Sequence, residues 1–355
     1  MKRQIIILAA CTMLIFSGCK KEPTTNEPTN PPANPSSTAF LLNEGNWGSN
    51  DAEISLVNLA EGTLRTNWFS SQNGRGLGDV AQDLIHYGNK LYATVYQSGK
   101  LEVIDPITGK SIKQIDMGNR GPRYLAAHDG KVYVSCYDKS IVRIDTASLS
   151  IEATCILSGM QPEQLCILGN DIVVCNCWQY DNDGQSVYDN TLSVVDIASF
   201  TESRKIQVGT NPGKIKALDS HRCIVACSGD YGANPAQTIV LDLSNDSQET
   251  LPINATNFDV CNGYTYLYAT AYDENWNTTT SFYKMDINTL SCSPILESHS
   301  NTLSNAYGIN IDPSTGNIYI CNSAYGMNGD LYCFAPDGKE LWHAEACFYA
   351  SKVVF

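Results

Sequence analysis

The sequence lacks the short motifs that mark the common enzyme families. It has no nucleophile elbow, no HExxH zinc motif and no glycine-rich phosphate loop. The five histidines are scattered at His86, His128, His221, His299 and His343. CNC at 175–177 lacks the spacing of a zinc knuckle, and DNDG at 181–184 is half of a calcium loop. We therefore expect no enzyme and no resident metal or cofactor, although active residues spread over repeats would leave no motif.

Basic side chains are also scarce. The 355 residues include 23 Lys and Arg against 37 Asp and Glu, which gives a formal net charge of −14. A surface this acidic repels phosphate backbones, so nucleic acid is excluded as a partner. The hydrophobic fraction of 43% is typical of a globular protein. A single domain of this length is unusual unless repeats build it.

Long apolar runs are absent except near the N-terminus. IIILAACTMLIF at 5–16 follows Lys2 and Arg3, and FSGC then ends at Cys19. This order is typical of an export signal. FSGC resembles the lipobox of a bacterial lipoprotein, with Phe16 where Leu is usual. The resemblance implies a signal peptide over 1–18 and acylation of Cys19, so that lipid alone anchors the protein to a membrane. A plain secretory signal is the alternative.

Large apolar side chains are missing from the next stretch, residues 20–38. KKEPTTNEPTNPPANPSST consists largely of Pro, Thr, Asn and Ser, so it cannot bury enough apolar surface to fold, and proline keeps it extended. We predict that the lipidated Cys19 and a disordered linker occupy 19–38. The folded domain is expected to occupy 39–355.

Helical periodicity is nowhere sustained, and short alternating apolar runs take its place. One run recurs as KLYATVY, KVYVSCY, DIVVCNCW, RCIVACSG, YLYATAY and NIYICNS. A second follows it as LEVIDP, IVRIDT, LSVVDI, TIVLDL, FYKMDI and LYCFAP. The second run ends at Asp105, Asp145, Asp196, Asp242, Asp286 and Ala335, at steps of 40 to 51 residues. A repeat of this length with about four short strands is the signature of a β-propeller blade.

Six complete blades fit between Asp79 and Trp342, and two pieces are left over. FLLNEG, AEISLVNL and TLRTNWF at the N-terminus match the second, third and fourth strands of a blade, and YASKVVF at the C-terminus matches a lone first strand. We therefore predict an all-β fold, a seven-bladed β-propeller in which N- and C-terminal strands close one blade. This closure would remove exposed strand edges. Six blades with a loose N-terminal hairpin are the alternative.

The two faces of such a ring would differ in their loops. The turns between first and second strands are short, whereas the loops between second and third strands, and between blades, are long and aromatic. Turn chemistry explains their Asn and Gly but not their Trp, and exposed aromatic rings beside amides are typical of recognition surfaces. The expected ligand-binding residues are Asn46, Trp47, Arg75, Arg120, Arg123, Tyr137, Trp178, Tyr180, Tyr231, Asn275, Trp276, Tyr307 and Tyr325. The alternative is that each ring merely covers its own loop.

Twelve cysteines remain besides Cys11 and Cys19. Export favours disulfides, but cysteines inside the apolar strand runs are typical of small side chains packed between blades. We expect most of them to be buried thiols. Cys321 and Cys333 flank one hairpin and are the best pair for a bridge if one exists.

Three longer stretches carry a family resemblance. The repeated pattern shared by KLYATVY…LEVID and GKVYVSCYDKSIVRID resembles the repeats of the YncE-like, surface-layer-type propellers. FLLNEGNWGSNDAEISLVNL, GLGDVAQDLIHYGNKLYATVY and GNRGPRYLAAHDGKVYV resemble a narrower, BtuG-like group of lipid-anchored propellers from gut Bacteroides, over essentially the whole mature chain. The resemblance implies a cell-surface protein of the outer membrane that binds cobalamin with high affinity. It also implies delivery of this vitamin to a TonB-dependent, BtuB-type transporter.

The chemistry of the loop-rich face fits a corrinoid, a flat ring edged with amides that can stack on Trp and Tyr and bond to Asn and Asp. Arg75, Arg120 and Arg123 could meet the phosphate of its nucleotide tail. No histidine falls clearly on this face, so we predict no protein ligand to cobalt. KKE after Cys19 has one acidic residue where surface export signals of Bacteroides usually carry several, which leaves the periplasmic leaflet open. A glycan-binding or glycan-cleaving propeller, and an envelope scaffold, are the alternatives.

Overall fold

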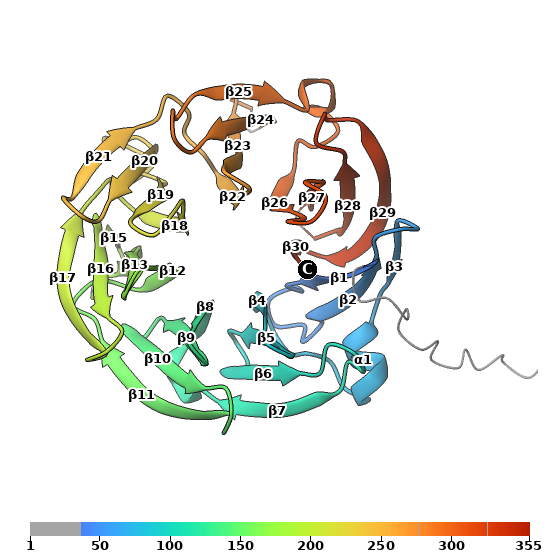
Figure 1. Ribbon diagram of the computed structural model, residues 1–355, viewed down its shortest axis with the longest axis horizontal. Coiled ribbons are helices and arrows are strands. Elements are labelled where there is room, and N and C mark those ends of the chain that lie inside the picture. Colours follow the sequence, from blue (N-terminus) through green and yellow to red (C-terminus); the bar gives the residue numbers. More distant parts are fainter. Residues whose placement is uncertain (1–36, 276, 325) are drawn as a thin grey trace, which may run out of the picture.

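The computed structural model describes residues 37–275, 277–324 and 326–355. The predicted signal peptide, the predicted lipidation site Cys19 and nearly all of the predicted linker lie outside these residues. Seven four-stranded antiparallel sheets stand around one axis as the blades of a closed ring (Figure 1). The prediction of an all-β, seven-bladed propeller is confirmed.

The strands of each blade run from the axis outward in the orders that follow. The blade that contains both chain ends has β30 (Ala350–Val354), β1 (Thr38–Asn43), β2 (Glu53–Asn58) and β3 (Thr63–Arg65). The next three have β4 (Ala81–Tyr87), β5 (Lys90–Val95), β6 (Lys100–Ile104) and β7 (Ser111–Asp116); β8 (Pro122–His128), β9 (Lys131–Cys136), β10 (Ser140–Asp145) and β11 (Ser150–Ile156); and β12 (Pro162–Leu168), β13 (Asp171–Asn176), β16 (Thr191–Asp196) and β17 (Thr201–Gln207).

The last three blades have β18 (Pro212–Ala217), β19 (Arg222–Cys227), β20 (Gln237–Asp242) and β21 (Ser247–Thr250); β22 (Asn257–Cys261), β23 (Tyr264–Tyr272), β24 (Thr278–Asp286) and β25 (Cys292–Ile295); and β26 (Ala306–Ile311), β27 (Ile318–Asn322), β28 (Asn328–Phe334) and β29 (Glu340–Phe348). The remaining elements are the hairpin β14 (Trp178–Tyr180) and β15 (Ser186–Tyr188), helix α1 (Trp68–Asn73), and the 3₁₀ helices η2 (Gly118–Arg120) and η3 (Glu297–His299). Within the described residues, no helix has both the length and the apolar character needed to cross a membrane.

The two ends of the chain close one blade. The C-terminal strand β30 is the innermost strand there and pairs antiparallel with β1, with Phe40 opposite Val354 and Leu41 opposite Val353. The N-terminal strands β1, β2 and β3 form the rest of this sheet, as the leftover pieces of the sequence predicted. Every first strand therefore lies at the centre of the ring, and none is left without a partner in its blade (Figure 1).

The middle strands of each blade are apolar because both of their faces are covered by neighbouring blades. β13 is buried from Ile172 to Asn176, while the outer strand β11 is mostly exposed. One hydrophobic cluster joins Val173 and Val194 of one blade to Val225 and Leu241 of the next. Burial on both faces replaces strict alternation by short continuous apolar runs, as in DIVVCN.

The recurrent aspartate of the repeat shapes a turn. Asp105 Oδ1 accepts hydrogen bonds from the backbone N–H groups of Ile107 and Thr108, at 2.8 and 2.9 Å. The same kind of contact is made within their own turns by Asp145, Asp196, Asp242 and Asp286. These carboxylates close the link between the third and fourth strands, so they are not available to a ligand.

All twelve described cysteines are free, and ten of them are buried. This distribution agrees with the expected buried thiols. Cys321 and Cys333 lie on the paired strands β27 and β28 but do not face each other, because Cys333 is opposite Tyr319 and Cys321 is opposite Leu331. The pair considered for a bridge is therefore not bonded.

Candidate binding site on the rim face

The face that we call the rim face consists of the loops between second and third strands and the loops between successive blades. Its opposite, the turn face, consists of the turns between first and second and between third and fourth strands. Each first strand begins at the rim face, because it follows a loop between blades. The first residues of the seven inner strands therefore surround the opening on this side.

Exposed aromatic rings are concentrated on the rim face. Tyr231 is 84% exposed, Trp47 66% and Tyr180 64%. Tyr272 and Tyr307 also lie on this face and are exposed, and Tyr264 alone among the exposed aromatic residues of the described chain lies on the turn face. Solvent-exposed aromatic side chains concentrated on one face of a protein are typical of a recognition surface.

The loop that carries Trp47 is held in place by its own polar groups. The backbone N–H of Asn46 donates to Asp51 at 2.7 Å, and the side-chain amide of Asn46 donates to the same carboxylate at 2.9 Å. Gly48 N–H donates to both carboxylate oxygens of Asp79, at 3.0 Å each. Trp47 is thus exposed on an ordered loop, and its Asn46 neighbour is used to build that loop.

Trp47 of one blade and Tyr137 and Arg123 of another, all predicted site residues, are connected through Tyr96 of the blade between them. The Trp47 ring lies 5.8 Å from that of Tyr96, which lies 5.4 Å from that of Tyr137. The Arg123 guanidinium lies 4.5 Å from the centre of the Tyr137 ring and forms an ion pair of 2.9 Å with Glu163. Tyr137 also donates its hydroxyl to Glu163. Arg123 is therefore largely committed to contacts within the protein.

Three further predicted residues lie on loops of the rim face. Trp178 and Tyr180 contact edge to face, with ring centres 4.9 Å apart, on the hairpin of β14 and β15. Tyr231 has a left-handed backbone, with φ of 59°, in a loop that Asp230 closes by accepting from Asn234 N–H at 2.9 Å.

Asn275 lies in a loop of the same design, in which its N–H donates to Asp273 at 2.8 Å. Trp276 and Tyr325, which were also predicted site residues, lie outside the described residues. Within the described chain, no group of three or more His, Cys, Asp or Glu side chains is arranged to hold a metal ion.

Two of the predicted arginines lie away from the centre of the ring. Arg75 forms a bidentate pair with Glu102, at 2.7 and 3.2 Å, beside the outer strands. Arg120 lies 3.9 Å from Asp138 and donates to the carbonyl of Met117. Neither residue lines the central cavity described next.

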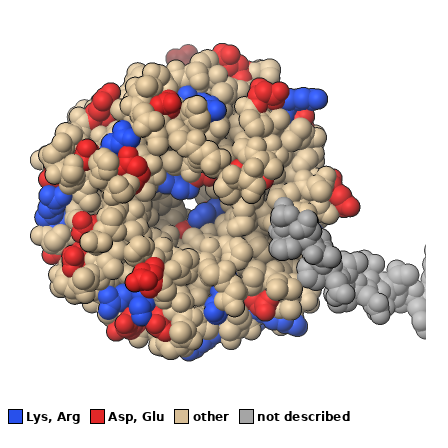
Figure 2. Space-filling view, viewed as in Figure 1, with Lys and Arg blue, Asp and Glu red and all other residues tan. Residues whose placement is uncertain are grey.

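A cavity of about 710 Å³ occupies the centre of the ring. Figure 2 shows its opening, with basic side chains at the edge of the hole. Its polar lining residues come mainly from the inner strands and include Glu44, Gln82, Asp83, Tyr124, Gln164, Lys214, Lys216, Asn257, Tyr307, Asn310, Ser351 and Lys352. Tyr307 joins this cavity to the exposed aromatic rings.

Ion pairs and backbone contacts tie the inner strands together around the cavity. Lys352 Nζ lies 2.6 Å from Asp83 Oδ1, and Asp83 Oδ2 accepts from Leu125 N–H of the neighbouring blade at 2.9 Å. Lys216 pairs in the same way with Asp259, whose second oxygen accepts from the backbone of the next blade. These carboxylates therefore stabilise the contacts between neighbouring blades.

Glu44 is a different kind of carboxyl group. It follows β1, lines the cavity, and accepts a hydrogen bond of 2.9 Å from the Tyr307 hydroxyl. Burial raises the pKa of Glu44 to about 7, and the Tyr307 hydrogen bond and the charges of Lys214 and Arg123 oppose this rise. A carboxyl group that titrates near neutral pH inside a cavity is a functional-site candidate.

The sequence prediction did not include the inner-strand lining, because it placed the site residues on the long aromatic loops. One signal was present: the third residue of β8, β12 and β18 is Tyr124, Gln164 and Lys214, a polar side chain directly before a buried apolar residue. Glu44 lies in NEGNWGSND directly after the buried strand β1. Tyr124, Gln164 and Lys214 hold equivalent positions in their first strands, whereas Glu44 follows a second strand and has no such signal.

Comparison with known proteins shows the fold. Hydrazine synthase of Kuenenia stuttgartiensis is similar with a TM-score of 0.60 and 14% identity, over 72% of this chain and 77% of that chain. The computationally designed Ika8 protein is similar with a TM-score of 0.58 and 13% identity, over 90% of each chain. No protein-family model and no curated protein sequence matches this chain.

Proposed function

We propose that this protein is a non-enzymatic, lipid-anchored binding protein that takes cobalamin and related corrinoids on its rim face. The observation that carries the proposal is the concentration of exposed aromatic rings on one face, around the mouth of the central cavity. The resemblance of NEGNWGSND and its flanking strands to BtuG-like propellers supports the choice of ligand. The similar solved structures support the fold alone.

The chemistry of the rim face suits a wide, flat ligand edged with amides. Trp47, Tyr180 and Tyr231 offer apolar faces for stacking. Asn257, Gln164 and Tyr307 at the cavity offer amide and hydroxyl groups that can bond to acetamide and propionamide arms. A corrin ring would lie across the mouth of the cavity, with the aromatic rings around its edge.

The cellular role follows from the anchor and the spacer. Acylated Cys19 and the extended linker would hold the propeller away from the outer membrane, on the cell surface. A binding protein held there can concentrate a scarce vitamin and pass it to a TonB-dependent, BtuB-type transporter. Co-purification of such a transporter from outer membranes tests this part of the proposal.

Calorimetric titration of the intact protein with cyanocobalamin tests the ligand. We expect tight binding with one corrinoid per protein. If neither heat nor a gel shift is observed, the corrinoid proposal is wrong and the propeller fold is unaffected. A glycan panel is the next titration in that case, because exposed Trp and Tyr beside amides also suit sugars.

A further inference from the structure

We propose that the mouth of the central cavity contains a subsite for one small oxyanion group, a phosphodiester or a carboxylate, held by the Lys214 ammonium group and the Tyr124 hydroxyl. The proposal rests on the proposed function in one respect: the anionic group is part of the ligand that covers the rim face. The two residues belong to different blades, β18 and β8, and both line the cavity.

Lys214 differs from the other cations of the cavity in forming no direct ion pair among the described residues, although the charges of Glu163 and Glu44 act on it from a greater distance. Lys216 and Lys352 each form an ion pair with an aspartate, and Arg123 pairs with Glu163. In the described part of the chain, no carboxylate lies within 4.0 Å of the Lys214 ammonium group, whose hydrogen-bond partner is the Tyr124 hydroxyl at 3.2 Å. An ammonium group has three donors, so two of them remain for a ligand.

The Tyr124 hydroxyl is oriented to donate. Its oxygen accepts from Lys214 and, at 3.1 Å, from the side-chain amide of Gln82. The orientation of Gln82 is determined by Arg123, which donates to its carbonyl oxygen Oε1 and leaves Nε2 for Tyr124. Both contacts use the oxygen as acceptor, and among the described residues no group accepts the hydroxyl proton. That proton is free for a ligand oxygen in the cavity.

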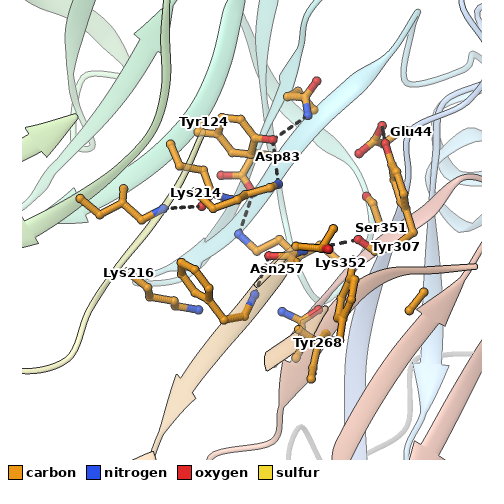
Figure 3. A pocket seen from close by; sticks show the side chains of 18 of the residues that line it. Glu44, Asp83, Tyr124, Lys214, Lys216, Asn257, Tyr268, Tyr307, Ser351 and Lys352 are labelled. Atoms are coloured by element: carbon orange, nitrogen blue, oxygen red, sulfur yellow. Dashed lines mark hydrogen bonds and ion pairs between the residues drawn. The ribbon is translucent and has the colours of Figure 1, made fainter. Parts of the chain in front are cut away.

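The proton stays on Tyr124 at neutral pH. Burial raises the pKa of Tyr124 above its ordinary value, against the lowering effect of Lys214. Figure 3 shows Lys214 reaching Tyr124 on one side of the cavity, with Glu44 and Tyr307 on the other. Two donors of this kind, one of them charged, match an oxyanion and offer nothing to a cation.

Glu44 makes the subsite sensitive to pH. The groups that interact with its carboxyl are Tyr307 from β26, Lys214 from β18, Arg123 and Tyr124 from β8, Cys321 from β27 and Ser351 from β30. Below pH 7 the neutral Glu44 no longer offsets the charge of Lys214, while Glu163, which is paired with Arg123, still acts on it. Above pH 7 the ionised Glu44 attracts Lys214 and repels an incoming anion, so an oxyanion binds more tightly in the acidic range.

The test uses isolated anions and no corrinoid. Dimethyl phosphate and acetate, both monoanions from pH 6 to 8, are titrated into the intact protein and observed by ³¹P and ¹³C relaxation. We expect at least one of them to bind at millimolar concentration, and more tightly at pH 6 than at pH 8. The anion that binds more tightly identifies the group, phosphodiester or carboxylate, that the subsite takes.

Three variants locate the site. Lys214→Met should weaken anion binding about tenfold and Tyr124→Phe by a smaller factor, while Lys113→Met removes an equal charge from the exposed outer strand β7 and should change nothing. Tyr124→Phe keeps the ring, so it answers the question even if Lys214→Met fails to fold. Absence of binding to the unaltered protein, or equal binding by Tyr124→Phe, overturns the subsite. Failure with cobalamin alone overturns the proposed function and leaves the subsite standing.

Discussion

The rim face and the turn face are made by the same seven blades, yet their side chains are used differently. On the turn face, Asp105 and its equivalents accept hydrogen bonds from their own turns, and Tyr264 is the one exposed aromatic residue there among the described residues. On the rim face, aspartates such as Asp230 and Asp273 also close their loops, but Trp47 and Tyr231 project beyond them. Turn building therefore accounts for these acids on both faces, but it does not account for the exposed aromatic rings that are concentrated on the rim face.

The pKa values of the carboxyl groups divide by role and not by face, since hydrogen bonds within their own loops also lower the pKa of Asp230 and Asp273 on the rim face. Hydrogen bonds from the turn backbone and nearby hydroxyls hold the pKa of Asp196 and Asp242 below its ordinary value on the turn face. At the mouth of the cavity, burial raises the pKa of Glu44 instead. Carboxylates that build turns are stabilised as anions, whereas the carboxyl at the rim-face opening is kept close to its neutral form.

The largest expected effect concerns the buried ion pair behind the rim. Arg123→Ala leaves Glu163 buried without its partner and should lower the free energy of unfolding by about 3–5 kcal/mol. Arg120→Ala removes a more exposed arginine, 3.9 Å from Asp138, and should cost less than about 1 kcal/mol. Urea unfolding measures both. Equal losses would show that Arg123 is not the structural residue that its contacts indicate.

The second prediction concerns Glu44 and pH. Its pKa is about 7 in the folded protein against 4.5 as the ordinary value, so folding favours the protonated form. This contribution is complete below pH 4.5 and is lost as pH rises through 7, with a cost of up to about 3 kcal/mol at pH 8. Glu44→Gln should therefore be more stable than the unaltered protein at pH 8.

The control for Glu44 is Glu61→Gln, an exposed position on the turn face. Urea unfolding at pH 5 and pH 8 gives the comparison. The difference in stability between the two pH values should shrink in Glu44→Gln and remain in Glu61→Gln. The same pH dependence in both variants would contradict the prediction that Glu44 is responsible for the difference in stability.

The third prediction tests the aromatic rings directly. Trp47→Ala and Tyr231→Ala should each weaken corrinoid binding about 10- to 100-fold, because each removes a stacking surface. Tyr264→Ala removes the exposed ring of the turn face and should leave the affinity unchanged. Calorimetry compares the three variants. A loss at Tyr264 equal to that at Trp47 would place the ligand elsewhere.

The smallest expected effect concerns a turn. Asn58 holds the recurrent position in the blade that both chain ends share, and its side chain accepts from Ala60 and Glu61 N–H at 3.1 Å each. Asn58→Ala should lower the free energy of unfolding by about 1 kcal/mol without changing ligand affinity. Urea unfolding and calorimetry on the same variant separate the two properties. A change in ligand affinity would mean that the structure of this turn affects the binding site on the opposite face.

The fold was predictable because its signals are local. Strands alternate within a few residues, turns are closed by a side chain two or three residues away, and both recur about every 45 residues along the chain. The leftover strands at 40–65 and 349–355 likewise belonged to one blade by their patterns alone, which Phe40 opposite Val354 confirms.

The site was predictable only in part. Loop length and composition placed Trp47, Tyr137 and Tyr231 on one face, since a propeller alternates its loops between two sides. The same reasoning offered Arg75 and Arg120 as ligand contacts, whereas their carboxylate partners Glu102 and Asp138 come from other segments of the chain. An ion pair between residues of separate segments cannot be predicted from the sequence of one loop.

The sequence by itself determined the repeat, the number of blades, the closure by the two ends, and which loops share a face, because each depends on neighbouring residues. Tertiary structure decided which groups meet on the axis. Lys214, Tyr124 and Glu44 come from blades far apart in the chain, and the pKa of Glu44 depends on burial that only the closed ring creates. Proximity across blades and exclusion of water are properties of the assembled ring.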